Sequence, residues 1–116
     1  MKLGLHAMFY SSQAEELRKF LRDKLDFEAT DIGGGWLIFK VPVADMGVHP
    51  TDGDDVESGT ADISFYCDDI FETVKTLKER GVMFDMDVQE HSYGFVTMFQ
   101  VPGGFSLQLY QPKYSK

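Results

Sequence analysis

The sequence predicts a single α+β domain made of two similar units, each with a strand, a helix and three further strands. Residues 6–27 run in step with residues 62–83 at an offset of 56 positions, and residues 39–42 return as residues 99–102 at an offset of 60. Each half also shows strand-like alternation followed by helix-like spacing of apolar residues. Because neither unit is expected to bury its apolar face alone, we expect the two to complete each other and to form a cleft where they meet.

Length and composition narrow the class of protein. A chain of 116 residues suits one compact domain that needs no disulfide or metal for its stability. The net charge of −8 argues against nucleic acid and anionic membranes as partners, because phosphate recognition draws on clustered Lys and Arg. The single cysteine, Cys67, excludes an internal disulfide, and neither a membrane-spanning run nor a signal-peptide pattern is present. We therefore expect a cytoplasmic protein whose ligand is neutral or cationic.

A strand is expected at the start of each unit, at residues 3–10 and 61–67. Side chains alternate there with the period of two typical of a half-buried strand. In the first strand one face carries Leu3, Leu5, Ala7 and Phe9, and the other carries His6, Met8 and Tyr10. In the second strand one face carries Ala61, Ile63, Phe65 and Cys67, and the other carries Asp62, Ser64 and Tyr66.

A helix is expected after each of these strands. Ser12 and Glu15 have the spacing of a capping box, and Asp69 with Glu72 repeats this start signal in the second unit. The apolar residues that follow recur at the spacing of one helical face: Leu17, Phe20, Leu21 and Leu25 in the first helix, and Ile70, Val74 and Leu77 in the second. Gly81 is expected to end the second helix.

Three more strands should complete each unit. We expect them at residues 28–32, 35–41 and 44–49, then at 84–88, 94–101 and 105–111, with Gly33 and Gly34 in one hairpin turn and residues 102–104 in another. Residues 51–60 are polar and acidic and lack a hydrophobic period, which indicates a solvated linker. The domain then divides into a first module at about 1–50, the linker, and a second module at about 61–116.

This order of elements resembles the vicinal oxygen chelate superfamily, which includes glyoxalase I, extradiol dioxygenases and bleomycin-resistance proteins. Three stretches carry the resemblance: FLRDKLDF at 20–27 is similar to FYxxVLGF, residues 67–82 are similar to VDDIDAAVxxLKxxGV, and VPGGFSLQLYQP at 101–112 is similar to DPDGNxIEL. The resemblance covers nearly the whole chain. It implies two βαβββ modules whose curved sheets form a partly closed barrel around a cavity, and it implies a homodimer.

The resemblance also implies a candidate metal site. In metal-dependent relatives the ligands come from the first and last strand of each module, and these positions fall on His6, Asp62, Gln108 and a residue near Asp45, with a possible slip to Gly47 or His49. Such a set could hold a divalent ion such as Fe, Mn, Zn or Ni. Gln108 is a weak neutral donor, however, and a protein without a metal is the alternative. His6 and Asp62 could equally be ordinary polar strand residues, and His49 before Pro50 a loop residue.

Several other side chains are expected to line the cavity and to bind a ligand. They are Met8, Tyr10, His49, Ser64, Tyr66, His91, Tyr93 and Tyr110, of which His91 and Tyr93 are expected in a loop at residues 89–94. The tyrosines would stack on a ligand, although such amphipathic aromatics also cover sheet surfaces without a function. Trp36 is expected in the core or at an interface rather than in the pocket.

Two classes of function follow from this resemblance. The first is a metal-dependent lyase, isomerase or dioxygenase, in which the ion polarises an oxygen-bearing substrate. The second is a metal-free protein that sequesters an aromatic or cationic small molecule between tyrosines and acidic walls, like the bleomycin-resistance members. True glyoxalase I activity is not expected, because Gln108 replaces the Glu that serves the family as a base. Asp62 likewise breaks the two-His set used in extradiol cleavage.

Overall fold

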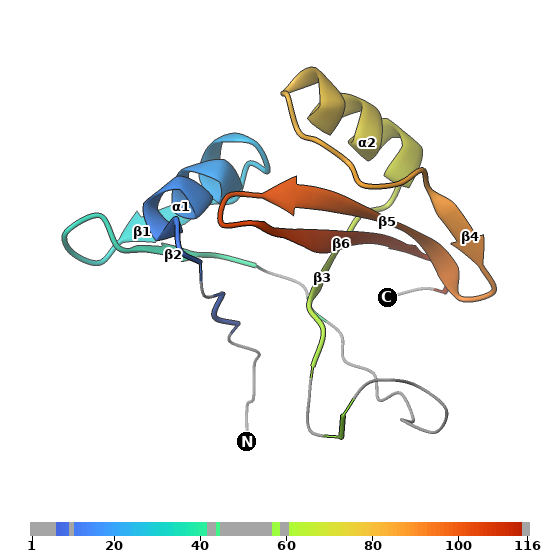
Figure 1. The fold of residues 1–116 in the computed structure, drawn as a ribbon, viewed down its shortest axis with the longest axis horizontal. Coiled ribbons are helices and arrows are strands. Elements are labelled where there is room, and N and C mark those ends of the chain that lie inside the picture. The colour runs from blue at the N-terminus through green and yellow to red at the C-terminus, as the bar shows by residue number, and fades with distance from the viewer. Residues whose placement is uncertain (1–6, 10, 42–43, 45–56, 59–60, 115–116) are drawn as a thin grey trace.

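The structure is a computed structural model that describes residues 7–9, 11–41, 44, 57–58 and 61–114. Its elements (Figure 1) are α1 (Ala14–Asp23), β1 (Ala29–Asp31), β2 (Leu37–Phe39), β3 (Ser64–Tyr66), α2 (Ile70–Glu79), β4 (Gln89–His91), β5 (Gly94–Val101) and β6 (Phe105–Pro112). The mixed α+β class is confirmed. Neither of the two sheets formed by these residues closes on itself, so the predicted partly closed barrel is not confirmed. No helix in the described ranges is long and apolar enough to cross a membrane.

The second unit has the predicted order of strand, helix and three strands. Its sheet has the order β3-β6-β5-β4, in which β3 runs parallel to β6 and the other two pairs are antiparallel. Strands β5 and β6 form the long central hairpin, and Gly103 and Gly104 turn it with φ angles of 115° and 80°. The predicted strand at 61–67 is confirmed only at its centre, where β3 pairs with β6.

The first unit is described in part. Strands β1 and β2 pair antiparallel as the predicted hairpin, with Gly33 and Gly34 at positive φ in its turn. Residues 7–9 and Ala44 form no strand, and the other residues of the predicted strands at 3–10 and 44–49 lie outside the described residues. Of the predicted linker, only residues 57–58 are described, and they belong to no helix or strand.

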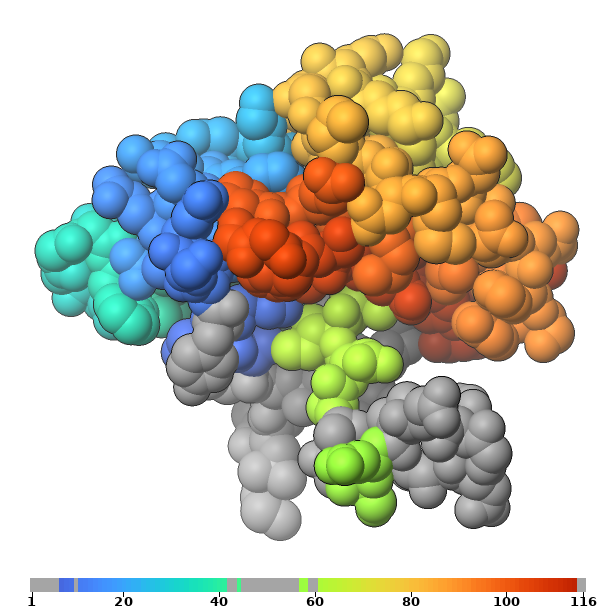
Figure 2. Space-filling view, viewed as in Figure 1, coloured from blue at the N-terminus to red at the C-terminus, as the bar shows by residue number. Residues whose placement is uncertain are grey.

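The two helices begin in different ways. Asp69 caps α2 as predicted, since its side chain accepts a hydrogen bond from the backbone N–H of Glu72 at 3.1 Å. The predicted Ser12 cap of α1 is wrong, because α1 starts after Gln13 without a side-chain cap. Ser11 instead turns towards the β5–β6 hairpin and donates its hydroxyl to the carbonyl oxygen of Pro102 at 3.0 Å. Figure 2 shows the resulting contact, where the tip of this hairpin lies against α1.

The segment before β5 departs from the prediction. The predicted strand at 84–88 and loop at 89–94 are wrong, because Phe84 makes only an isolated bridge with Phe99 and the paired strand β4 begins at Gln89. Phe84 and Gln89 are five positions apart, whereas their partners on β5, Phe99 and Val96, are three positions apart. Two extra residues therefore bulge out of the strand pairing before β5. The buried Thr97 hydroxyl donates to the carbonyl oxygen of Met86 at 2.9 Å, which stabilises this bulge.

One apolar core joins the two units. It lies on the face of β5 and β6 that is covered by both helices, and Phe99 at its centre is fully buried. The first unit contributes two buried leucines from α1, and the ring of Phe20 stacks on Phe99 with centroids 6.4 Å apart. The buried members are Leu17, Leu21, Ile70, Leu77, Val82, Phe99, Val101, Leu107 and Leu109.

Residues at matching positions of the two units contact each other directly. Lys24 donates from Nζ to the carbonyl oxygen of Arg80 at 2.8 Å, and Arg80 donates back to the carbonyl oxygen of Lys24 at 2.7 Å, across exactly the repeat offset of 56. Phe9 and Phe65, separated by the same offset, pack edge to face with centroids 6.3 Å apart. Reciprocal contacts of this kind are those of a two-fold interface. The two units therefore meet through residues at matching positions of the repeat.

Loss of the Arg80 side chain should weaken the contact between the units. Arg80 also forms an ion pair with Asp26 at 2.8 Å, and these groups are partly exposed. We expect Arg80→Ala to lower the free energy of unfolding by about 1 kcal/mol, measured by urea denaturation. Arg22→Ala is the control, because among the described residues Arg22 pairs with the adjacent Asp23 in the same helix and not with the second unit. A loss no larger than that of the control would contradict this role.

Candidate functional site

The candidate site is the face of the four-stranded sheet that points away from the helices. Residues paired across neighbouring strands share a face, and side chains alternate along each strand. Since Leu107 and Leu109 lie in the core, Ser106, Gln108 and Tyr110 point to the opposite side. Cross-strand pairing adds Met98 opposite Gln108 and Val96 opposite Tyr110 from β5, and Ser64 and Tyr66 from β3. We call this surface the open face.

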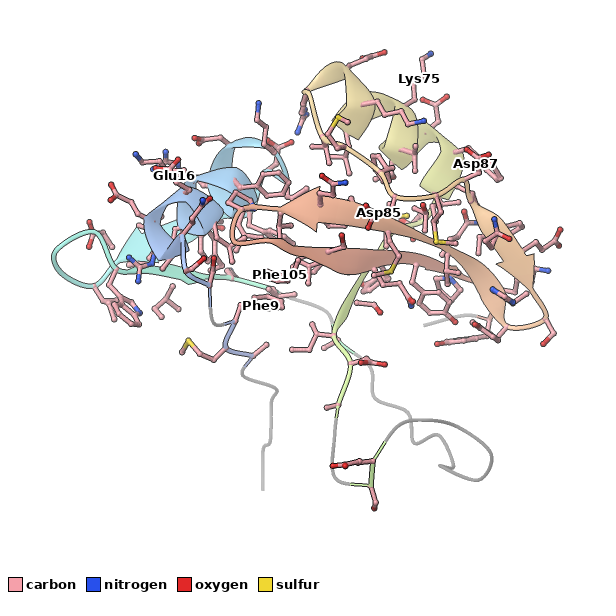
Figure 3. All side chains as sticks on the ribbon, in the orientation of Figure 1. Phe9, Glu16, Lys75, Asp85, Asp87 and Phe105 are labelled. Atoms are coloured by element: carbon pink, nitrogen blue, oxygen red, sulfur yellow. The ribbon has the colours of Figure 1, made fainter. Side chains whose placement is uncertain are left out.

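A carboxylate with two donors lies at one end of the open face. The side chain of Asp85 (labelled in Figure 3) accepts hydrogen bonds from the Ser106 hydroxyl and, at 2.9 Å, from the Gln100 amide. Hydrogen bonding by Ser106 and then by Gln100 lowers the pKa of the Asp85 carboxyl below its ordinary value. Asp85 is therefore ionised at neutral pH and gives this end of the face a fixed negative charge.

The centre of the open face is polar but neutral. The amide of Gln108 donates to the hydroxyl of Ser64 at 3.0 Å, which links β6 to β3 in the row where these residues pair. Asp85 lies near the same row, because its backbone N–H donates to the carbonyl oxygen of Met98, the cross-strand partner of Gln108. A ligand on this face would meet hydrogen-bonding groups flanked by a carboxylate.

Aromatic rings gather at the other end of the open face. Tyr110 donates its hydroxyl to the carbonyl oxygen of Tyr93 at 3.2 Å, and the two ring centroids lie 6.1 Å apart. His91 stacks on Tyr93 with centroids 5.2 Å apart and planes 4° from parallel. The ring centroid of Tyr114 lies 6.3 Å from that of Tyr110. We call these four residues the aromatic cluster.

Gly94 makes this arrangement possible. A side chain at position 94 would overlap the ring of Tyr110 and the carbonyl oxygen of Gln111 on the neighbouring strand β6. The absence of a Cβ atom therefore lets the ring of Tyr110 lie across the β4–β5 hairpin, next to Tyr93.

The predicted cavity residues are placed as follows. Ser64, Tyr66, Gln108 and Tyr110 share the open face, as strand alternation predicts. His91 is in β4 rather than in the predicted loop, and Tyr93 is in the two-residue turn that follows. Met8 is exposed and belongs to no strand. Tyr10 and His49 lie outside the described residues.

The predicted metal ligands are only partly described. Asp62 is exposed and precedes β3 by two residues, and Gln108 is engaged with Ser64, while His6, Asp45 and His49 lie outside the described residues. Across the described ranges, no group of three or more His, Cys, Asp or Glu residues is placed to hold a metal ion. The described donors, one carboxylate and one hydrogen-bonded amide, do not make up a metal site, and the predicted site stays a prediction.

Sequence reasoning missed Asp85, Gln100 and Ser106. Ser106 could have been found, because it precedes Gln108 by two positions in a strand whose bounds were predicted closely. Asp85 could not, because the bulge after it breaks the alternation that assigns a residue to a face.

Three comparisons with known proteins were made, with a family model, with curated proteins and with solved structures. The model of the Glyoxalase/Bleomycin resistance protein/Dioxygenase superfamily matches residues 5–109. No match was found among curated proteins. Several solved structures share the fold over nearly the whole chain.

Three of these structures show the range of relatives. TnmS3, an antibiotic binding protein from Streptomyces sp. CB03234, has a TM-score of 0.68 and 23% identity over 97% of this chain and 99% of its own. A superfamily member from Sphaerobacter thermophilus DSM 20745 has a TM-score of 0.58 and 27% identity, and the match covers 90% of this chain and 91% of that protein. Lactoylglutathione lyase from Agrobacterium tumefaciens has a TM-score of 0.63 and 15% identity, and the match covers 95% of this chain and 96% of that protein.

The bonds to Asp85 should appear in the pH dependence of stability. Because its folded pKa is lowered, its contribution is complete above the unfolded pKa of about 3.9 and is lost as pH falls through the folded pKa. We expect Asp85→Asn to lose less stability than the parent protein between about pH 5 and pH 2, measured by thermal unfolding. Asp87→Asn, at an exposed aspartate of the same segment, is the control. Parallel pH curves for the parent and Asp85→Asn would contradict the expectation.

Proposed function

Since this chain belongs to the glyoxalase/bleomycin resistance protein/dioxygenase superfamily, we propose that it binds a small aromatic molecule on its open face, without the aid of a metal. The observation that carries this proposal is the aromatic cluster at one end of that face, formed by His91, Tyr93, Tyr110 and Tyr114.

The geometry of the cluster suits a planar ligand. The rings of Tyr93 and Tyr114 are tilted by 49° and 52° from that of Tyr110, so the three do not form one flat stack. Tyr93 and Tyr114 are each 52% exposed, which leaves ring surface for a guest to cover. Each aromatic contact contributes about 0.5–1.5 kcal/mol beyond the burial of area. Two or three such contacts would give useful affinity without any covalent chemistry.

Charge favours a neutral or cationic ligand over an anion. The chain has a net charge of −8, and the ionised carboxylate of Asp85 lies on the same face as the tyrosines. A negative surface raises the local concentration of cations, and tyrosine rings attract a cation placed over them. We infer a ligand whose aromatic part stacks on the aromatic cluster and whose polar part reaches towards Gln108 and Asp85.

The relatives support this class of function without deciding it. One structure of the same fold is described as an antibiotic binding protein, and another as a lactoylglutathione lyase. The fold therefore serves both binding and catalysis, and the side chains must decide between them. Here the closing strand carries an amide, Gln108, where the catalytic members are expected to carry a carboxylate base.

A metal-dependent enzyme is the second candidate. It is favoured by one observation, which is that Gln108, a predicted ligand, does lie on the open face. In that version His6, Asp45 or His49, Asp62 and Gln108 would hold a divalent ion, which would supply Lewis-acid chemistry when bound.

A planar aromatic cation should bind and should depend on Tyr110. With berberine as the probe, we expect binding measured by its fluorescence, and about a tenfold loss of affinity in Tyr110→Leu because one aromatic contact is removed. Tyr110→Phe keeps the ring and should bind within about threefold of the parent. Phe71→Leu, at an exposed aromatic on α2, is the control. The aromatic anion anilinonaphthalene sulfonate should bind more weakly than berberine.

The same titration separates the two candidates. A chelator should leave berberine binding unchanged, and protein purified without a nickel column should hold no stoichiometric metal. Binding that disappears with EDTA and returns with one divalent ion would overturn the metal-free proposal in favour of the enzyme. Equal berberine affinity in the parent and Tyr110→Leu would rule out the aromatic cluster as the site.

We also propose that the protein is a homodimer in the cytoplasm. An exposed apolar group on the β1–β2 hairpin supports the dimer, since Ile32, Trp36 and Ile38 are 65%, 48% and 37% exposed. Light scattering at micromolar concentration should give about twice the chain mass of 13.2 kDa, and Trp36→Glu should lower it to that of one chain. A mass of 13.2 kDa for the parent protein would contradict this proposal.

A further inference from the structure

A second cavity lies on the helix side of the sheet, away from the open face. It has a volume of about 390 Å³ and lies between the chain that follows α1 and the inner side of α2. Its floor includes Phe65, Phe99 and Leu109, which alternate with the open-face residues of the same strands. A molecule in this cavity could not touch the aromatic cluster, because the sheet separates the two. The proposed function does not account for it.

The surface of this cavity is more apolar than polar. Phe27 and Phe65 form one wall, with ring centroids 4.9 Å apart and planes tilted by 50°. Leu25, Leu77, Phe99 and Leu109 complete the apolar lining. Cys67 is the one thiol at this wall, and burial raises the pKa of that thiol, which keeps it neutral at pH 7. The lining resembles that of sites that hold uncharged organic molecules.

The charges around the cavity balance. Two cationic residues, Lys24 and Arg80, and two acidic residues, Asp26 and Glu72, take part in its lining. Arg80 is paired with Asp26 at 2.8 Å, and the ammonium of Lys24 is held by the carbonyl oxygen of Arg80. The lining as a whole carries no net charge, so an ion of either sign would lose hydration without a net electrostatic attraction to replace it. The lining therefore favours a neutral guest.

We propose that this cavity is a second ligand site, which takes a neutral molecule of one or two aromatic rings. Its volume lies within the range of about 300–1,000 Å³ typical of small-molecule sites. The ligand would contact both units, because residues 24–27 belong to the first and α2 to the second. It binds only when the units are paired and therefore stabilises their pairing by mass action.

Indole is a suitable probe, and Cys67 is a built-in reporter. Cys67 is the single cysteine of the chain and lines the cavity, so its alkylation by N-ethylmaleimide measures occupancy at that point. We expect saturating indole to slow alkylation at pH 8.5 by about fivefold or more, because the bound molecule covers the thiol. Indole-3-acetate, which adds a carboxylate, should protect less than indole at the same concentration.

Two variants of α2 form a matched pair. Thr76 is an exposed residue that lines the cavity, whereas its neighbour Lys75 (labelled in Figure 3) does not line it. Thr76→Trp should fill the cavity and remove the effect of indole, and Lys75→Trp should leave it intact. Both should bind berberine like the parent protein, which shows that the fold and the open face are preserved. Failure of berberine binding in the parent would count against the open face alone.

Three results would overturn the second site. They are an alkylation rate that indole does not change, a protection that is equal in Thr76→Trp and Lys75→Trp, and a stronger protection by indole-3-acetate than by indole. Methyl NMR shifts of Leu77 and Leu109 on adding indole give an independent measurement in the parent protein, since both residues line the cavity. Their absence at saturating indole would also contradict the proposal.

Discussion

The fold depends on one shared core, because the second unit provides the sheet on which the helix of the first unit packs. Leu17 and Leu21 of α1 are buried in the same cluster as Leu107 and Leu109 of β6, and Phe20 stacks on Phe99 of β5. A two-stranded hairpin such as β1–β2 is marginal alone in water, so this docking adds to the stability of the described part of the first unit. Everything proposed here about ligands requires the two units to stay paired.

The same strands serve two purposes because their side chains alternate. On β6, Leu107 and Leu109 face the core, while Ser106, Gln108 and Tyr110 face the other way. The helix side is covered by the helices and contains a partly open, mainly apolar cavity, whereas the open face combines a carboxylate, amides and rings. The two proposed sites differ in chemistry as a direct result of this alternation.

Much of the second unit could be predicted from the sequence, since its signals are local. The alternation in residues 94–101 and 105–111 gave strand bounds within one residue, and the Asp69 cap and Gly81 stop framed α2. The start of α1 was misplaced because Ser11, next to the expected cap Ser12, is drawn to Pro102, a contact 91 residues away in the chain. The bulge at residues 85–88 hid Asp85, because its cause is a mismatch with the partner strand. Local patterns carry no information on such distant contacts.

The bonds between Lys24 and Arg80 end on backbone carbonyl oxygens, which every residue provides. These two hydrogen bonds therefore require a long cationic side chain in each half, but no particular side chain at the position that accepts. The sequences of the two similar halves can therefore differ while the hydrogen bonds between Lys24 and Arg80 are kept. This tolerance explains how the halves can retain a reciprocal contact although one carries an acidic, aromatic surface and the described part of the other consists of a helix and a small hairpin.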